Sequence, residues 1–360
     1  MQENNIISIF KNAMLKNALD ASFYVDAPEA WNEVWLQLQY QTVSAHRTSL
    51  LFSQTYLVDS GHKVYDLSLI LCSDGRPVGL LPLSLEQIGQ RWKFGSMGGA
   101  VTAPMFVPLL SPRTIKKLCV RILNVLQQLV SDLSFDQLCT EQPNSPLIDA
   151  AGSCSQWHQL LMGVGATLQT RHDLFVDLSL DLTSIRSIYR KSYRPLINLA
   201  LKTWQVSVMD AKSANAQVWA EFKQLHKQVA GRSTRSDITW ELLWRALCFG
   251  EAFLVNLRNP IDHRLVGTGF FRFTRDEGVY AIGAYDRSLF DKPLGHAVQQ
   301  RAIEMFKSLG VRWYLIGERF YSQSQYAPSA KEVAISEFKQ GFSSHLFCRH
   351  QFTLPVISHQ

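Results

Sequence analysis

The sequence has little that would indicate a metal centre, a disulfide framework or a membrane span. Its six cysteines are scattered over 360 residues without a CxxC pair, and no HExxH spacing occurs. No run of about 18 uninterrupted apolar residues is present, so we expect no membrane-spanning helix. The N-terminal MQENNIISIFKNAM lacks the basic start and long apolar core of a signal peptide. We therefore expect a cytoplasmic protein with reduced thiols and no metal.

Two further absences narrow the function. The ten histidines are dispersed and suggest no Ser/His/Asp constellation, so we expect no covalent enzyme intermediate. The basic residues include neither an RNA-recognition motif nor a basic tail, and DNA binding is not expected. A hydrophobic fraction of 46% with 18% charged residues is typical of a folded protein. The net charge of +6 favours anionic partners such as nucleotides, coenzyme A, RNA or acidic glycans.

An internal repeat is the most informative feature that is present. Residues 74–95 and 262–283 align without a gap, and five positions are identical. The identical pairs are Asp74 and Asp262, Arg76 and Arg264, Val78 and Val266, Gly79 and Gly267, and Gly95 and Gly283. An apolar strand-like run precedes each copy, YDLSLILC in the first and EAFLVNL in the second.

Each copy continues as three strands, a helix and a further strand. The helices are predicted from apolar faces, Leu118, Ile122, Val125 and Leu129 in the first copy and Val298, Ala302, Phe306 and Leu309 in the second. The pattern predicts a tandem duplication of one α+β unit, each a mainly antiparallel sheet flanked by helices. We expect domains over residues 1–175 and 176–360.

The segments outside the repeats predict four more elements. The basic TSIRSIYRKSYRPLINLALK is expected to be a helix kinked or split at Pro195. NAQVWAEFKQLHKQVAG predicts a second helix, ending at Gly231. Near the C-terminus, KEVAISEFKQGF predicts a short helix that ends at Gly341, and SSHLFCRHQFTL a final strand.

This order of elements is that of a GNAT N-acyltransferase domain. Two such domains in tandem, the second ending in a helix with FK..F, resemble the FemABX-like acyltransferases. The resemblance covers roughly residues 20–355 and is most specific in four segments: RKSYRPLIN, AGRSTRSDITW, GEAFLV with VGTGFF, and KE with EFKQGF.

The resemblance implies transfer of an acyl or aminoacyl group to an amine on an amino sugar, a nucleotide-linked sugar, a surface glycan or a cell-wall precursor. Members that take the aminoacyl group from tRNA carry a long helical arm in the second domain, and no such hairpin is expected here. A partial pyrophosphate loop, DKPLGHAVQQ, favours acyl-CoA as the co-substrate, and the resemblance leaves aminoacyl-tRNA as the alternative. A non-catalytic glycan- or nucleotide-binding module is a third hypothesis.

The loop DKPLGHAVQQ is the candidate donor site. Lys292, Gly295 and Ala297 resemble the family pattern Q/R-x-x-G-x-G/A, with Lys in place of Gln or Arg. A glycine lets a pyrophosphate approach the helix N-terminus, where Lys292 and His296 could add positive charge. The alternative is an ordinary strand-to-helix loop. The equivalent loop of the first repeat, LLSPRTIKKL, has no glycine, so the second domain is expected to bind the donor.

Two basic segments are candidates for binding the anionic part of a substrate. In AGRSTRSDITW, Arg232, Thr234 and Arg235 could hold a phosphate or carboxylate, or the segment could be a solvated loop with Asp237 capping the next helix.

The second basic segment is RKSYR. Its Arg190, Lys191 and Arg194 lie within two helical turns, and Arg190 and Arg194 are expected on one face, either as an anion-binding patch or as a solvated surface.

Candidates for the chemistry follow two strands of the second repeat. Glu318 comes after the strand WYLIG and could accept the proton of the amine, or pair with Arg319. Tyr285 and Asp286, at the end of the preceding strand, are similar candidates.

Two tyrosines and one lysine complete the predicted site. Tyr321 and Tyr326 could line a sugar or peptide cleft, or pack. Phe338 and Phe342 are expected to anchor the C-terminal helix while Lys339 points elsewhere. The resemblance implies that Lys339 faces the reacting centre, and we expect it to stabilise negative charge.

Overall fold

The computed structural model describes residues 3–142, 154–324 and 327–355, which form two compact units. The first unit comprises the described parts of Met1–Tyr40, Ser53–Arg171 and Cys348–Gln360, and the second comprises Gln41–Phe52 and His172–Phe347. This division differs from residues 1–175 and 176–360 in three segments. Gln41–Phe52 and residues 172–175 belong to the second unit, and the C-terminal segment from Cys348 belongs to the first. Within the described ranges, no helix is long and apolar enough to cross a bilayer.

The first unit combines short, mainly antiparallel sheets with helices, and its one parallel pair among the described strands is β7 with β9. Its strands pair in the orders β1-β3-β4-β8, β2-β5-β6 and β16-β9-β7. The strands are β1 (Ala21–Phe23), β2 (Lys63–Asp66), β3 (Leu69–Ser73), β4 (Arg76–Leu81), β5 (Ser84–Ile88), β6 (Arg91–Gly95), β7 (Val101–Thr102), β8 (Met105–Phe106), β9 (Gln137–Gln142) and the C-terminal part of β16 (His345–Pro355). The helices are α1 (Glu3–Lys16), α2 (Pro28–Gln37), the second half of α3 (Arg47–Asp59), α4 (Pro112–Asp132) and α6 (Gln156–Gly163).

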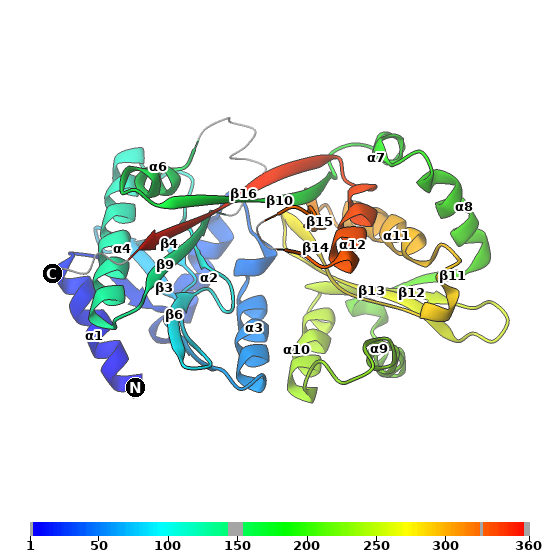
Figure 1. The fold of residues 1–360 in the computed structure, drawn as a ribbon, viewed down its shortest axis with the longest axis horizontal. Helices are drawn as coiled ribbons and strands as arrows, with labels where there is room; N and C mark the ends of the chain where they lie inside the picture. The colour runs from blue at the N-terminus through cyan, green and yellow to red at the C-terminus, as the bar shows by residue number, and fades with distance from the viewer. Residues whose placement is uncertain (1–2, 143–153, 325–326, 356–360) are drawn as a thin grey trace. The chain divides into compact units, whose positions relative to one another are not determined.

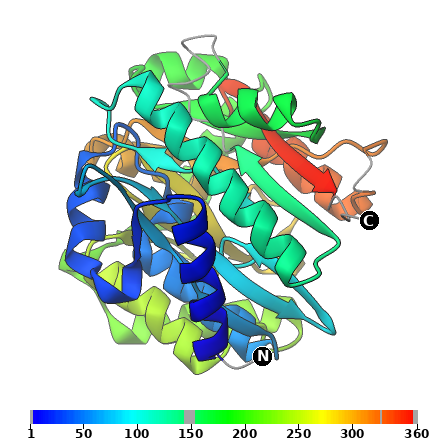
Figure 2. The same ribbon diagram turned by 90° about the vertical axis from the view of Figure 1, so that its left-hand side faces the viewer.

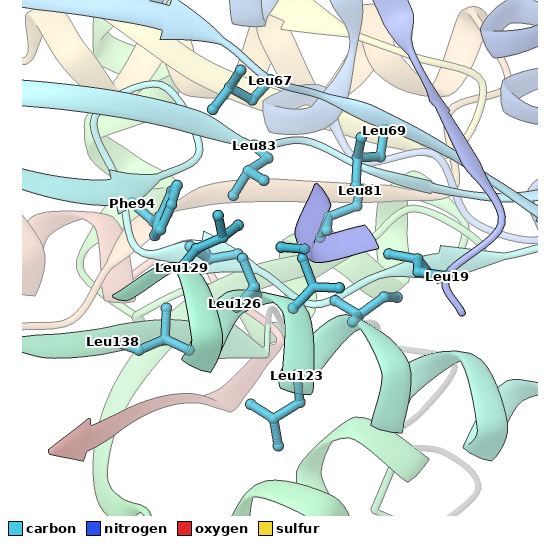
Figure 3. Packing of buried hydrophobic residues seen from close by; sticks show 14 of the residues in the cluster. Leu19, Leu67, Leu69, Leu81, Leu83, Phe94, Leu123, Leu126, Leu129 and Leu138 are labelled. Carbon is cyan, nitrogen blue, oxygen red and sulfur yellow. The ribbon is translucent and has the colours of Figure 1, made fainter. Parts of the chain in front are cut away.

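The core of the first unit lies between its strands and α4. Leu126 and Leu129 of α4 point toward Leu81 of β4 and Leu83 of the segment after it, and all four are buried (Figure 3). The predicted apolar face of this helix is confirmed, because its four residues are all buried: Leu118, Ile122, Val125 and Leu129. Helix α1 packs beside α4 (Figure 2).

The second unit is built on one twisted sheet of order β11-β12-β13-β14-β15-β10. Its strands are β11 (Gln205–Met209), β12 (Ala252–Arg258), β13 (Leu265–Phe273), β14 (Glu277–Tyr285), β15 (Trp313–Glu318) and the second half of β10 (Thr167–Asp177). Its helices are α7 (Leu182–Ile188), α8 (Tyr193–Thr203), α9 (Ala216–Ala230), α10 (Asp237–Cys248), α11 (Leu294–Ser308) and α12 (Ala330–Gln340). Only β14 and β15 run parallel among these pairs, because α11 crosses over between them.

Helices cover both faces of this sheet (Figure 1). On β12, Phe253 and Val255 point to the core shared with α8 and α11, whereas Ala252 and Leu254 point to the core shared with α9 and α10. Such alternation is the period of a strand that is buried on both sides. The two helix pairs therefore lie on opposite faces.

The second unit has the predicted order of three strands, a helix and a strand, in β12, β13, β14, α11 and β15. The first unit departs from it, because β3 and β4 pair in one sheet and β5 and β6 in another before α4 and β9 follow. Val298, Ala302 and Phe306 of α11 are fully buried, but Leu309 is 40% exposed because the helix ends at Ser308. Gly310 follows with φ +74°, as expected for a residue that ends a helix. The predicted basic helix is split into α7 and α8, but the break lies between Ile188 and Tyr193, and Pro195 is in the first turn of α8.

Candidate active site

The central feature of the second unit is an opening in its sheet between β14 and β15. The two strands pair only from Glu277–Val279 to Trp313–Leu315, and beyond these residues they have no ladder between them. Each strand is irregular where the ladder ends. The register of β14 against β13 shifts at Ala281, and that of β15 against β10 shifts at Ile316. A bulge bends its strand and increases the local twist, so the two bulges explain why the strands diverge.

Lys339 reaches this opening from the last turn of α12. Its side chain lies against Gly317 of β15, where an added Cβ would come within 2.5 Å of Nζ. Its ammonium lies 5.5 Å from the ring centroid of Tyr280 of β14. Burial lowers the pKa of Lys339, and within the described residues it forms no ion pair. Among the described residues, the Lys339 ammonium faces an aromatic ring and no carboxylate, which leaves it available to an anion.

Two tyrosines of β14 complete the wall of the opening. The hydroxyls of Tyr280 and Tyr285 share a hydrogen bond of 2.9 Å. Burial raises the pKa of Tyr280 to about 12, and burial beside Tyr280 raises that of Tyr285 well above 10. Both phenols are consequently protonated at neutral pH. This corrects the suggestion that Tyr285 accepts a proton, since it is suited to donating a hydrogen bond.

We predict that Tyr285→Phe lowers the free energy of unfolding by about 1–3 kcal/mol, because it leaves the Tyr280 hydroxyl without its partner. Urea denaturation measures the change. The matched control is Tyr321→Phe, whose ring is 41% exposed and which should change stability by less than about 0.5 kcal/mol. Equal stability of Tyr285→Phe and the wild type would contradict the paired hydroxyls.

Glu318 directly follows Gly317 at the end of β15, and its backbone pairs with Asp173 of β10. It is half-buried beside the opening, a position compatible with the predicted proton acceptor. Arg319 forms its ion pair with Glu337 of α12, at 3.2 Å. Asp286 has a structural role, because it accepts hydrogen bonds from Ser288 and pairs with Arg264 at 2.7 Å. The Ser288 hydrogen bond and Arg264 hold the pKa of Asp286 below its usual range.

The predicted donor loop leads into α11, whose N-terminus adjoins α12. No side chain caps α11, so backbone N–H groups of its first turn are available to an anion. Lys292 lies beside this turn, 5.6 Å above the ring of Trp204. An added Cβ at Gly295 would come within 3.0 Å of the Phe338 ring. Close packing against α12 is therefore a sufficient reason for a glycine at this position, without a bound pyrophosphate. Ala297 is fully buried.

His296 does not supply the expected charge. Its ring packs edge-on against Tyr193 and Phe338, at centroid distances of 4.7 and 5.1 Å. Burial lowers the pKa of His296 to about 4, because an imidazolium would lose hydration in this aromatic cluster. His296 is therefore neutral at pH 7, and Lys292 is the cation of the loop.

Arg232, Thr234 and Arg235 lie in the loop between α9 and α10, whose helices cover the opposite sheet face from α8 and α11. Arg235 contacts His226 Nε2 at 3.0 Å and Thr234 Oγ1 at 3.2 Å, and stacks on Trp240. Arg232 is exposed. The predicted cap at Asp237 is wrong, because the Ser236 side chain accepts the hydrogen bond from Thr239 N and Asp237 begins the helix.

The expected common helix face of Arg190 and Arg194 is also wrong, because α7 ends at Ile188 and α8 begins at Tyr193. The Arg190 guanidinium donates to Glu337 O and its backbone N–H donates to Gly341 O, so Arg190 fastens the end of the helix that carries Lys339. Arg194 donates to the backbone at the end of α7. Lys191 is exposed between the helices.

The aromatic candidates differ in outcome. Tyr321 is exposed, with the Arg319 guanidinium 4.6 Å above its ring and His172 edge-on at 5.4 Å. Tyr326 lies outside the described residues. The predictions missed Tyr280, which carries the cation–π contact. Tyr280 is the fourth residue of β14, and no sequence pattern there marks an active-site residue.

Searches with the sequence found no matching family model and no matching curated protein. Solved structures do match. FemX has a TM-score of 0.66 at 11% identity, over 93% of this chain and 98% of that one. L-PGS from Bacillus licheniformis has a TM-score of 0.55 at 13% identity, over 92% and 93%. The C-terminal domain of a putative lysylphosphatidylglycerol synthetase from Agrobacterium fabrum has 0.53 at 11%, over 92% of each chain. These likenesses establish the fold.

Proposed function

We propose that this protein, whose fold is the FemABX-like arrangement of two tandem GNAT-like units, is an N-acyltransferase. The observation that carries the proposal is the Lys339 ammonium, which lies at the opening between β14 and β15 without a carboxylate partner in the part of the chain that the structure describes. Two protonated tyrosines and an uncapped helix N-terminus adjoin it. This combination is suited to stabilising an oxyanion and holding a donor phosphate.

Transfer forms a C–N bond between the amine and the acyl carbon and breaks the bond from that carbon to the leaving group. Glu318 takes the proton that the amine loses. The Lys339 ammonium and the Tyr285 hydroxyl stabilise the negative charge that develops on the acyl oxygen. A charged donor is stronger in this role than a neutral one.

The favoured donor is acyl-CoA, with its phosphates at the start of α11 beside Lys292. The loop matches a pyrophosphate site only in part. Gly295 packs against the Phe338 ring, and His296 is neutral and adds no positive charge. The α9–α10 pair supports the choice, since its helices of 15 and 12 residues pack on the sheet and form no long arm. The acceptor would be the amine of an amino sugar, a nucleotide-linked sugar, a surface glycan or a cell-wall precursor in the cytoplasm.

An aminoacyl donor is the second candidate. The resemblance to FemABX-like proteins implies aminoacyl-tRNA for some members, and two matching structures are named for lysylphosphatidylglycerol synthesis. Lys339 and the tyrosines would serve either donor, because both reactions pass through an oxyanion at an acyl carbon.

The test compares the two donor classes on the purified protein. We expect acetyl-CoA to raise the melting temperature, because a ligand that binds the native state stabilises it. Lys292→Ala should weaken this shift, whereas the matched control Lys331→Ala, an exposed lysine of α12, should not. Radiolabelled acetyl transfer to glucosamine and UDP-glucosamine then measures turnover.

The results distinguish the two donor classes from each other and from a non-catalytic binding module. A shift with aminoacyl-tRNA alone would overturn the choice of acyl-CoA. Binding of an acceptor amine without turnover of either donor would identify a non-catalytic binding module and overturn the transferase.

A further inference from the structure

The first unit contains a cleft of about 470 Å³ that none of the proposed chemistry uses. It lies on the face of β9 opposite α4. Leu138 of β9 faces the core with α4, whereas Cys139 and Glu141 line the cleft. Its volume falls in the range of small-molecule sites, roughly 300–1,000 Å³.

Three cations converge on this cleft from three strands. Lys93 comes from β6, Arg171 from β10 and Arg349 from β16. Arg349 forms an ion pair of 2.7 Å with Glu141, which fixes its guanidinium in the lining. Lys93 lies 3.3 Å from Glu86, a fully buried carboxylate beneath the lining. Among the described residues that line the cleft or lie directly beneath it, three are cationic and two are carboxylates.

Glu86 also builds the loop at the rim of the cleft. Its carboxylate accepts hydrogen bonds from Ser84 Oγ at 2.6 Å and from Gly98 N at 2.7 Å. A Cβ at Gly95 would lie 2.6 Å from Glu86 Oε1, so only glycine permits this approach. Met97 adopts φ +55° in the same loop. A buried carboxylate and a strained turn thereby hold the rim in one conformation, as a preformed binding site requires.

The internal repeat gives the cleft its place in the fold. Gly95, which ends β6, aligns with Gly283 of β14, and β9 follows its helix as β15 follows α11. The cleft thus occupies in the first unit the position that the opening occupies in the second. The residues differ, since the first unit presents Lys93, Arg171 and Arg349 and its helix α4 is capped by Ser111.

We propose that this cleft binds a small molecule through a phosphate or carboxylate group, held by Arg349, Arg171 and Lys93. Arginine presents a planar fork that matches both oxyanions, and Lys93 adds a point charge. The proposal does not rest on the transferase activity of the second unit, because it concerns a separate site within the first.

Cys139 provides a direct readout, because it lines the cleft. The experiment follows alkylation of Cys139 by N-ethylmaleimide with mass spectrometry, in sodium phosphate, in sodium succinate, and in sodium chloride of equal ionic strength. Cys248, exposed in the second unit, is the internal control. We expect phosphate, succinate or both to slow alkylation of Cys139 at least about threefold relative to chloride, a ratio worth about 0.65 kcal/mol in binding. Cys248 should react equally in all three.

Variants connect the protection to the cations. Gln351→Glu adds a negative charge to the lining without removing an ion pair, and should abolish protection, as should Arg349→Gln. Lys117→Met removes an exposed charge of α4 that does not line the cleft, and this variant should retain the protection of Cys139. Protection by phosphate alone or by succinate alone identifies the group. Protection no greater than in chloride, or its persistence in Gln351→Glu, would overturn the proposal.

Discussion

Replacing Lys339 with methionine is expected to slow acyl transfer by about 10²–10³-fold, the effect of removing one oxyanion donor in other enzymes. Methionine retains the apolar stem that packs against Gly317 and loses only the ammonium. If the charge acts on the developing oxyanion, kcat and kcat/KM should fall together. The measurement is steady-state transfer with whichever donor the binding experiment identifies. Lys331→Met, which removes an exposed lysine from the same helix, is the control and should leave both parameters unchanged.

The stability of this variant tests the burial of Lys339 independently of activity. Burial lowers the pKa of Lys339 from its usual 10.5, so the unfolded chain holds the proton more firmly than the folded one. The cost of burying the charge is fully present below the folded pKa, and it fades as the pH rises toward 10.5. Lys339→Met should therefore be at least as stable as the wild type near pH 7, with an advantage that shrinks at alkaline pH. A variant that is less stable at pH 7 by several kcal/mol would show that the ammonium is paired.

Replacing Gly317 with alanine is expected to impair both folding and transfer. Gly317 has φ +147°, where a side chain is strained, and an added Cβ would meet Lys339 Nζ at 2.5 Å and Cδ at 3.0 Å. Strain of this kind costs about 1–3 kcal/mol, and the lysine must also leave its position over Tyr280. We expect urea denaturation to show that loss, and transfer by the folded fraction to fall at least about tenfold.

Gly310→Ala separates strain from displacement of the lysine. Gly310 also has positive φ, +74°, but an added Cβ there would meet nothing within 4 Å. Its alanine variant should lose about 1 kcal/mol of stability and keep its rate of transfer. If Gly317→Ala lost stability to the same extent and retained full activity, the contact between Gly317 and Lys339 would have no catalytic consequence.

Much of the fold could be predicted from local patterns. The apolar faces of α4 and α11, the start of α8 just before Pro195 and the end of α12 at Gly341 depend on spacing within a few residues. The repeat then predicted two like units, because similar sequences form similar strands and helices. The boundaries were harder to predict, since Gln41–Phe52 joins the second unit through long-range contacts. One of these is the hydrogen bond of 2.8 Å from Val43 N to the Glu277 carboxylate.

The candidate site could be predicted only in part. Lys339 was identified by a resemblance, since its spacing alone is that of a surface lysine. Tyr280 and Gly317 were not identified, because their meeting with Lys339 needs two bulges that open the sheet between β14 and β15. The charge of His296 was predicted wrongly, because an imidazole pKa depends on neighbours from α8 and α12.

The sequence by itself determined the elements, their duplication and the residue types available for chemistry, because these follow from local spacing and composition. Tertiary structure decided which of those residues meet. It separated Arg232 and Arg235 from Lys339 by placing their helices on opposite faces of one sheet. It also placed the Lys339 ammonium against the ring of Tyr280. Burial there lowers the pKa of Lys339, and no local sequence pattern encodes that burial.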